Sequence, residues 1–262
     1  MKYDEIDFVC KFTSMLSDRE WCDFIATHQQ VKVITSALTK KYECLYKDNI
    51  YGDSVHVIVY ADGKPVATNA HLRNDLVPNI ACYLSLHTYV SPYTRKMGMF
   101  SQMSKMCVEK VDDAYIYGYP NANSYPGLIK LGWKVVKSGV SSIFVGLKKS
   151  VAQEHAKLQA IGDDYVTWRY KPFNSSYRIC RVKNVNLLLK VRDSKIGRLY
   201  FVVGHVNDVA ALDFGLVNPP LLFSYIRGKR LLLVRDSENT IVENTVYRTL
   251  NVDIPIWRCD TI

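Results

Sequence analysis

The chain has 262 residues, of which 48% are hydrophobic and 23% charged, so it can build a sizeable core and does not have the composition of a disordered protein. Its longest apolar runs are far too short to cross a bilayer, and acidic residues stand near the N-terminus where a secretory signal would be apolar; we expect a cytoplasmic protein with no membrane contact. Seven cysteines without a C-x-x-C pair exclude an evident zinc site or disulfide framework, while the net charge of +9 favours nucleic acid or a phosphate-rich cofactor as partner.

The first half of the chain predicts a helix and then a β-hairpin. Ser17 can cap the helix, and Glu20 can close a capping box three residues later. Asp62-Gly63 is the strongest short hairpin signal in the chain. It joins two predicted strands, at Val55–Tyr60 and Pro65–Leu72.

A strand, a turn and a helix follow at the centre of this half. We expect the strand at Ala81–Val90, the turn at Ser91–Met97 and the helix at Gly98–Val111. Shorter elements continue the alternation: strands at Ala114–Tyr119, Trp133–Val136 and Ser142–Leu147, and a helix at Asn123–Leu131 that Gly132 ends. This order predicts an α/β mixture.

The second half begins after a polar segment, Ser150–Ile161, which reads as a linker helix. Later elements are predicted strands at Tyr177–Lys183, Leu187–Arg192, Arg198–Gly204, Arg230–Arg235 and Thr245–Leu250, with a loop and helix region at Asn207–Leu216. The predicted organisation is therefore a domain at residues 1–149, a linker helix at 150–162 and a second, smaller α/β domain at 163–262.

The segment Arg95–Phe100 follows the central strand and opens the central helix. The first amides of a helix have no intrahelical partners, and the helix dipole adds partial positive charge there, so a pyrophosphate binds well at such an end. Gly98 lets the backbone approach phosphates closely, while Arg95 and Lys96 supply full charges. The alternative for these residues is a helix that starts at a glycine beside two solvated basic side chains.

The segment and its neighbours resemble the central signature of the GNAT N-acetyltransferase superfamily: a strand, a V-x-P-x-x-R-like turn, and then R/Q-x-x-G-x-G/A. Arg95 falls on the first position of the last motif and Gly98 on the fourth. Phe100 stands at the sixth position, where a small residue is usual but a subgroup of the superfamily has phenylalanine. Downstream, Tyr117–Trp133 reads YGYPNANSYPGLIKLGW and resembles the GFPNxNSYPGFxKLGW stretch of the same subgroup.

The resemblance covers roughly residues 10–149 well. The second half only loosely resembles the trailing, degenerate GNAT-like domain of tandem members, through Tyr165–Tyr170 and the strands after it. What the resemblance implies is a GNAT fold, an α+β arrangement in which helices flank a mixed central sheet, followed by a smaller GNAT-like half. It also implies acetyl-CoA as co-substrate and no metal.

The resemblance further implies which residues contact the cofactor. The end of the central strand would pair through its backbone with the pantetheine arm, the loop would hold the pyrophosphate, and an asparagine would contact the arm. The corresponding residues are Thr88, Tyr89 and Val90; Arg95, Lys96, Met97, Gly98, Met99 and Phe100; and Asn121 or Asn123.

The general acid and base are candidates only. The family often has, at the position of Leu128, a tyrosine that acts as the general acid and protonates the leaving thiolate. Tyr125, one helical turn earlier, is the candidate replacement. Packing at a helix start is the alternative role for Tyr125. An ammonium acceptor also needs a base, for which His87 and Tyr89 are candidates. The alternative for His87 is a purely structural strand histidine.

Three functions remain open at this point. The first is an N-acyltransferase that moves an acetyl group from acetyl-CoA to an unidentified primary amine by direct attack in a ternary complex. The second is a non-catalytic module of the same fold that binds nucleic acid, which Leu128 favours and the intact Arg95–Phe100 loop opposes. The third is an acyltransferase acting on a modified nucleic acid base. Trp168-Arg169-Tyr170 fits either a surface for bases or sugars or a packed contact between domains.

Overall fold

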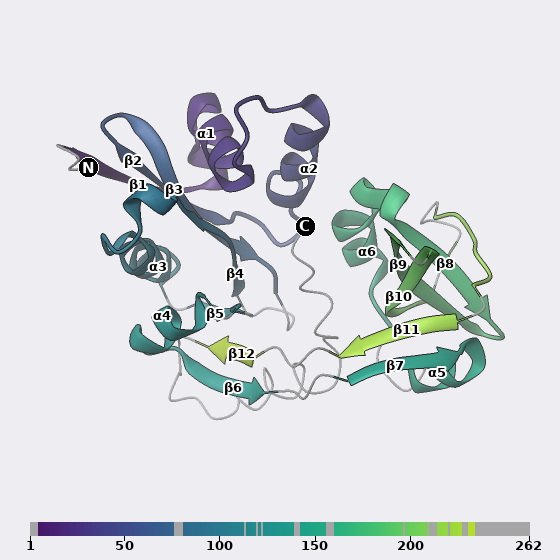
Figure 1. The fold of residues 1–262 in the computed structure, drawn as a ribbon. Helices are drawn as coiled ribbons and strands as arrows, with labels where there is room; N and C mark the ends of the chain where they lie inside the picture. Colours follow the sequence, from purple (N-terminus) through teal and green to yellow (C-terminus); the bar gives the residue numbers. More distant parts are fainter. Residues whose placement is uncertain are drawn as a thin grey trace. The chain divides into compact units, whose positions relative to one another are not determined.

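The computed structural model of the chain describes residues 5–233, apart from 76–80, 113, 119, 122, 139–141, 156–159, 196, 208, 210–213, 220 and 227–229. The described residues separate into two compact units. Unit 1 holds the residues up to Lys137 together with Arg230–Leu233, and unit 2 holds the residues from Ser138 up to Ile226 (Figure 1). The domain boundaries expected at 149 and 163 stay predictions.

Unit 1 is built on a seven-stranded mixed sheet with the order β1-β2-β3-β4-β5-β12-β6. Strands β1 to β4 are antiparallel, β4 and β5 are parallel, and β12 is antiparallel to β5. The strands are β1 Ile6–Phe12, β2 Val55–Ala61, β3 Lys64–Arg73, β4 Cys82–Val90, β5 Tyr115–Gly118, β12 Arg230–Leu233 and β6 Lys134–Ser138. The predicted mixed sheet flanked by helices is therefore confirmed.

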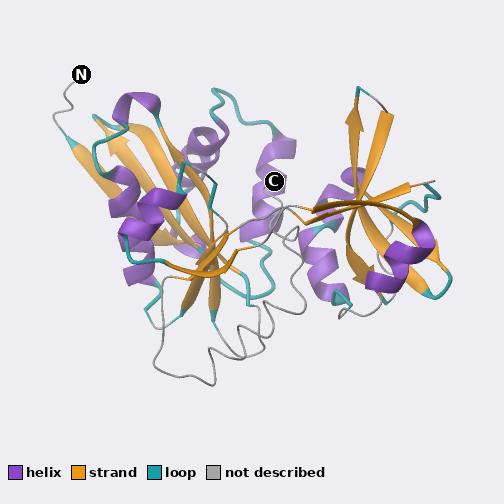
Figure 2. Cartoon of the chain, turned by 60° about the horizontal axis from the view of Figure 1, so that its bottom comes forward, coloured by secondary structure: helices purple, strands orange, loops and turns teal. Residues whose placement is uncertain are grey.

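Helices pack on both faces of this sheet (Figure 2). The helices of unit 1 are α1 Asp18–Gln29, α2 Ser36–Tyr46, α3 Met99–Lys110 and α4 Tyr125–Lys130. Alternate residues of β2 show the two faces, since Val57 packs in the core beneath α3, whereas His56 lies edge-on against Phe24 of α1. We call these the α3 face and the α1–α2 face.

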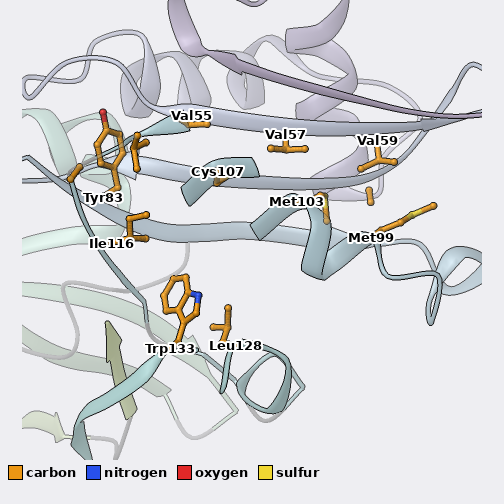
Figure 3. Packing of buried hydrophobic residues seen from close by; sticks show 13 residues of the cluster. Val55, Val57, Val59, Tyr83, Met99, Met103, Cys107, Ile116, Leu128 and Trp133 are labelled. Carbon is orange, nitrogen blue, oxygen red and sulfur yellow. The ribbon is translucent and has the colours of Figure 1, made fainter. Parts of the chain in front are cut away.

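The core on the α3 face is apolar and continuous (Figure 3). Every second residue of β2 enters it, and α3 covers it with its own buried face. The main side chains are Val55, Val57, Val59, Tyr83, Met99, Met103, Cys107, Ile116, Leu128 and Trp133. This core fixes α3 against the sheet and so fixes the loop that precedes α3.

Local sequence signals account for several of these elements. The capping box at the start of α1 is present, with the Ser17 side chain accepting from the Glu20 amide and the Glu20 side chain accepting from the Ser17 amide. Asp62 and Gly63 have φ of 48° and 71°, the left-handed pair that a two-residue hairpin turn needs. The predicted hairpin, central strand and central helix are all confirmed by β2, β3, β4 and α3.

Unit 2 is a five-stranded sheet with the order β7-β11-β10-β9-β8, accompanied by two helices and a 3₁₀ segment. The strands are β7 Ser142–Leu147, β11 Leu221–Ile226, β10 Gly197–Val206, β9 Val185–Ser194 and β8 Tyr177–Val182; the helices are α5 Lys148–His155, α6 Asp163–Arg169 and the 3₁₀ segment Lys171–Ser176. The described residues of 207–216 are not helical, and the strand predicted at 245–250 lies outside the described residues.

Trp168, Arg169 and Tyr170 are each no more than 5% exposed. The interpretation of this trio as a surface for bases or sugars is therefore wrong: Tyr170 packs in the core of unit 2, and Trp168 lies edge-on to Tyr165 of the same unit. Within the ranges that the structure describes, no helix has the length and apolar character needed to span a membrane.

Candidate functional site

The loop ahead of α3 is exposed and held in an unusual backbone conformation. Arg95, Lys96, Met97 and Gly98 are all exposed, and Lys96 and Gly98 have φ of 70° and 78°. Arg95, between β4 and these two residues, is extended, with φ of −61° and ψ of 152°. The Arg95 Nε donates to the Val90 carbonyl at 3.4 Å, which ties the loop to the end of β4.

The start of α3 carries no side-chain cap. Gly98 occupies the N-cap position, and its carbonyl accepts from the Gln102 amide at 3.0 Å. The amides of the first turn have no intrahelical acceptor, so they are available to an anion at this exposed end. A Cβ on Gly98 would meet no atom within 4 Å, so glycine is needed here for its positive φ and not for space.

Strand β4 leaves β5 before it ends. Its parallel ladder with β5 runs from Cys82↔Tyr115 to Ser85↔Gly118, while β4 itself continues to Val90 beside β3 alone in the described ladders. Within the described ladders, residues 86–90 of β4 have no partner on the β5 side, so this stretch can offer a backbone edge. Such an edge can pair with an extended chain of amides.

A β-bulge interrupts β4 in this same stretch. The pairing with β3 shifts between Thr68↔Tyr89 and Ala70↔Leu86, and His87 has φ of 53°. The Thr88 hydroxyl donates to the Asn69 side-chain carbonyl at 2.8 Å, toward the α3 face, whereas His87 lies against the α1–α2 rings. Regular alternation from Tyr83, which packs in the core of the α3 face, would put His87 on that face; the bulge turns the His87 side chain to the α1–α2 face instead, which is how bulges re-aim residues beside functional sites.

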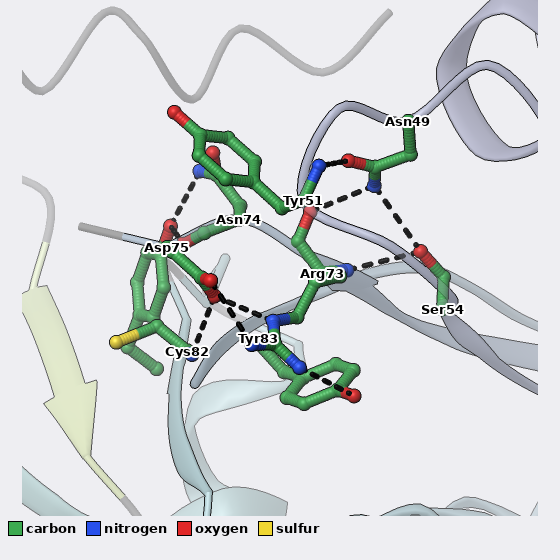
Figure 4. Close-up of polar contacts among 9 residues, drawn as sticks. Asn49, Tyr51, Ser54, Arg73, Asn74, Asp75, Cys82 and Tyr83 are labelled. Carbon is green, nitrogen blue, oxygen red and sulfur yellow. Dashed lines mark hydrogen bonds and ion pairs between the residues drawn. The ribbon is translucent and has the colours of Figure 1, made fainter. Parts of the chain in front are cut away.

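The other end of β4 is fixed by a polar cluster (Figure 4). The Asp75 carboxylate pairs with the Arg73 guanidinium at 2.5 Å and accepts from the Cys82 amide at 2.9 Å. Arg73 also donates to the Tyr83 hydroxyl at 3.3 Å, and its pKa is raised by the hydrogen bond to Asp75. Because these contacts anchor the start of β4 to the end of β3, we assign the cluster a structural role.

His87 is 6% exposed and lies in a group of rings on the α1–α2 face. Its Nδ1 is 2.7 Å from the Tyr46 hydroxyl, and its ring centroid is 4.3 Å from that of His28 and 5.3 Å from that of Tyr42. These three neighbours were not predicted from the sequence. The signal that could have found them is the i,i+4 spacing of Tyr42 and Tyr46, with Phe24 and His28 spaced alike on α1.

The group of rings is poor in charge at neutral pH. Burial, with Lys41 nearby, lowers the pKa of His28 to about 4, and burial lowers the pKa of His56 to about 3. Burial also raises the pKa of Tyr42 to about 12. These side chains are therefore neutral hydrogen-bonding groups around His87.

The two candidate asparagines differ in their roles. The Asn121 side-chain carbonyl accepts from the backbone amides of Asn123 and Ser124, each at 2.9 Å, so it is committed to the local turn. Asn123 is exposed beside that turn. Of the two, Asn123 is therefore the better placed to contact a ligand.

Tyr125 and His87 are not brought together by the described contacts. Tyr125 is half-buried and packs against the core of the α3 face, whereas His87 lies among the rings of the α1–α2 face. Leu128, at the position where the sequence resemblance predicts an acid, is 5% exposed and belongs to that same α3-face core. Among the described residues, no group of three histidine, cysteine, aspartate or glutamate side chains could hold a metal ion.

Comparisons with known proteins give a distant structural similarity. No family model and no curated protein matches the sequence. Solved structures that match include a GCN5-related N-acetyltransferase from Kribbella flavida, 10% identical over 87% of this chain and 71% of that chain, with a TM-score of 0.48. Eis1 from Mycobacterium abscessus is 11% identical over 87% of this chain and 74% of its own, with a TM-score of 0.49.

A third match, a predicted acetyltransferase from Clostridium acetobutylicum solved with acetyl-CoA, is 13% identical. It covers 52% of this chain and 94% of its own, with a TM-score of 0.41. With TM-scores below 0.5, these similarities do not by themselves assign an activity to the chain.

Proposed function

We propose that the chain is a GNAT-superfamily acyltransferase that moves an acetyl group from acetyl-CoA to a primary amine by direct attack in a ternary complex. The observation that carries the proposal is in unit 1, where the bulged end of β4 is followed, after a loop whose residues 95–98 are exposed, by a helix with a glycine at its N-cap. A strand edge suits a pantetheine arm, and a helix start suits a pyrophosphate.

The donor site is assigned along this path. Thr88, Tyr89 and Val90 offer the backbone edge for the two amides of the arm. The loop offers the Arg95 and Lys96 side chains and the first amides of α3 to the pyrophosphate. Because Met97 is 43% exposed, we assign it contact with the apolar parts of the cofactor.

The chemistry needs three functions from the chain. The amine nitrogen forms a bond to the acetyl carbonyl carbon, and the carbon–sulfur bond breaks to release coenzyme A. In this proposal His87 takes the proton from the amine, and Tyr125 gives one to the departing sulfur. A backbone N–H near the bulge donates to the carbonyl oxygen as negative charge develops on it.

The acceptor is sought by supplying radiolabelled acetyl-CoA to the full-length protein with pooled amines. The pools are amino acids, polyamines, aminoglycosides, peptides and nucleosides with free amino groups. We expect label in at least one pool, and none from a Gly98→Asp variant that folds. Wild-type protein that transfers no label and does not bind acetyl-CoA would refute the proposal; tight binding of nucleic acid by such a protein would support the non-catalytic module instead.

A further inference from the structure

The rings on the α1–α2 face form one buried group, which we call the ring cluster. Helix α1 contributes three rings, α2 two, and strands β2 and β4 one each; the members are Trp21, Phe24, His28, Tyr42, Tyr46, His56 and His87. Three of the seven are imidazoles. Packing alone favours phenylalanine or leucine at such positions, since every buried imidazole must find hydrogen-bond partners.

We infer that His28 and Tyr46 are positioning residues that hold His87 in the tautomer and orientation of a general base. The inference rests on the proposed function, since it concerns the base of that same reaction. Neither residue belongs to the sequence motifs from which the donor site was predicted. Both act through contacts with the His87 ring, one at its edge and one at its face.

Tyr46 acts at the edge. Its hydroxyl is 2.7 Å from the Nδ1 of His87, and the tyrosine is 1% exposed in the last turn of α2. If Nδ1 carries the proton and donates to the Tyr46 oxygen, the lone pair of the neutral ring is on Nε2, where it can accept a proton. A buried partner that fixes the tautomer of a catalytic histidine is the role that the third member of a catalytic triad has.

His28 acts at the face. Its ring lies 4.3 Å from that of His87 with an interplanar angle of 33°, and its own Nδ1 bonds to the Tyr42 hydroxyl. The Gln29 side chain donates to the same hydroxyl at 2.6 Å, so His28 is itself held in place. A neutral ring tilted over His87 restricts its rotation and tolerates the positive charge that proton transfer creates.

The electrostatic setting agrees with this role. The titratable groups in contact with His87 are His28 from α1 and Tyr42 and Tyr46 from α2. His56 from β2 lies against Tyr46, and its Nε2 is 2.9 Å from the Thr13 hydroxyl. Lys41 is the charged side chain that acts on His28. Because His28 and His56 stay neutral well below pH 7, neither opposes a charge on His87.

The backbone adds a reason for such support. His87 is in the bulge, with φ of 53°, and a left-handed conformation is unfavourable at a residue with a Cβ. A side chain on a strained, irregular stretch needs fixed neighbours to hold a single orientation. The Tyr46 hydroxyl and the His28 ring are those neighbours.

The test combines imidazole NMR with a pH profile. Full-length protein with ¹⁵N-labelled histidine reports the tautomer of His87, identified by the signal lost in His87→Gln. Acetyl-CoA hydrolysis, measured as released thiol, reports activity without a known acceptor, because water can take the place of the amine. The variants are Tyr46→Phe, His28→Ala and His28→Phe. Tyr60→Phe is the matched control, because it removes a hydroxyl that bonds Asp23 elsewhere in unit 1.

We expect the Nδ1–H tautomer in the wild type and a mixture of tautomers in Tyr46→Phe. The hydrolysis rate should fall about tenfold in Tyr46→Phe and in His28→Ala, with a shifted pH midpoint. It should recover to within about threefold in His28→Phe, which keeps a stacked ring, and stay unchanged in Tyr60→Phe. Thermal melts of every variant separate these effects from loss of folding.

The test distinguishes failure of this inference from failure of the proposed function. A wild type that hydrolyses or transfers acetyl while His87 is in the Nε2–H tautomer, or variants with unaltered pH profiles, would overturn the inference and leave the proposed function standing. A wild type with the expected tautomer that neither hydrolyses, transfers nor binds acetyl-CoA would overturn the proposed function, and the role of the two positioning residues with it.

Discussion

The ring of Phe100 lies where a Cβ on Gly127 would stand: such an atom would be 2.7 Å from Cε1 of the ring. Phe100 ends the candidate cofactor loop, and Gly127 is in α4, so this contact joins the two sequence motifs in space. A large residue at the sixth loop position is therefore matched by the absence of a side chain on the facing helix. Packing against Gly127 therefore explains how the loop accommodates Phe100 at a position where a small residue is usual.

Gly127→Ala should consequently destabilise unit 1. The added methyl overlaps the Phe100 ring, and overpacking of this kind usually lowers the free energy of unfolding by about 1–3 kcal/mol. Urea denaturation of the full-length chain measures the loss. The double variant with Phe100→Leu should recover most of it, since the shorter side chain leaves room. A loss that Phe100→Leu does not relieve would show that the contact is not its cause.

Much of unit 1 could be predicted from local signals. The Ser17–Glu20 capping box, the Asp62-Gly63 turn and the strand–turn–helix around Gly98 act between near neighbours in sequence, and the structure confirms all three. Helix α2 was not predicted, although the Thr35 hydroxyl accepts from the Leu38 amide at its start. Strands β1 and β11 were not predicted either.

The pairing of strands that are far apart in the chain could not be predicted from the sequence. Strand β12 was predicted as a strand of the second half, yet it pairs with β5 in the sheet of unit 1. A hydrophobic pattern states that a strand has a buried face but not which sheet covers it. For the same reason His87 could be selected by its position near the loop. The i,i+4 spacings of Tyr46 and His28 indicate aromatic helix faces, but only the packing of α1 and α2 on β4 places those faces against His87.

A pair of substitutions at Gly98 separates backbone strain from charge. Gly98 has φ of 78°, which both asparagine and aspartate adopt at a cost of about 1 kcal/mol. Gly98→Asn and Gly98→Asp should therefore lower stability alike. Coenzyme A affinity should fall far more in Gly98→Asp, because a carboxylate there repels the pyrophosphate. Equal affinity in the two variants, measured by calorimetry, would make the loop a structural feature only.

Tyr125→Phe tests the candidate acid by removing one hydroxyl. General acid catalysis is typically worth about 10²–10⁴-fold, so the maximal rate with the acceptor found by screening should fall at least about tenfold. Affinity for acetyl-CoA should change little. A rate equal to that of the wild type would leave Tyr125 as the packing residue that its place against the α3-face core also permits. A parallel loss of affinity would make it a cofactor-binding group instead.

Mild acid should destabilise the fold. Burial lowers the pKa of His28 to about 4 and those of His56 and His71 to about 3, against about 6.5 in the unfolded chain. Below pH 6.5 the unfolded state binds protons that the folded state excludes, so stability that is complete above pH 6.5 is lost as the pH falls toward 4. Each histidine contributes up to about 1.4 kcal/mol per pH unit in that window.

His71 provides the matched variant for this prediction. It is fully buried, its two ring nitrogens have no hydrogen-bond partner within the described part of the chain, and its ring lies edge-on to Trp133. His71→Phe keeps an aromatic ring and removes one titrating group. Urea denaturation at pH 7, 6 and 5 should show a shallower slope for the variant, by about one proton. If the free energy of unfolding of the wild type does not change between pH 6.5 and 5, the lowered pKa values of these histidines are contradicted.

The most direct measurement is calorimetric titration of the full-length chain with acetyl-CoA. The full chain is required because β12 completes the sheet beside β5, so a fragment ending near Ser150 would lack a strand of unit 1. We expect saturable binding of one acetyl-CoA per chain, with the affinity strongly reduced in Gly98→Asp and reduced much less in Gly98→Asn. A folded wild-type protein with no detectable binding would contradict the claim that this strand end and helix start form a site for an acyl-CoA.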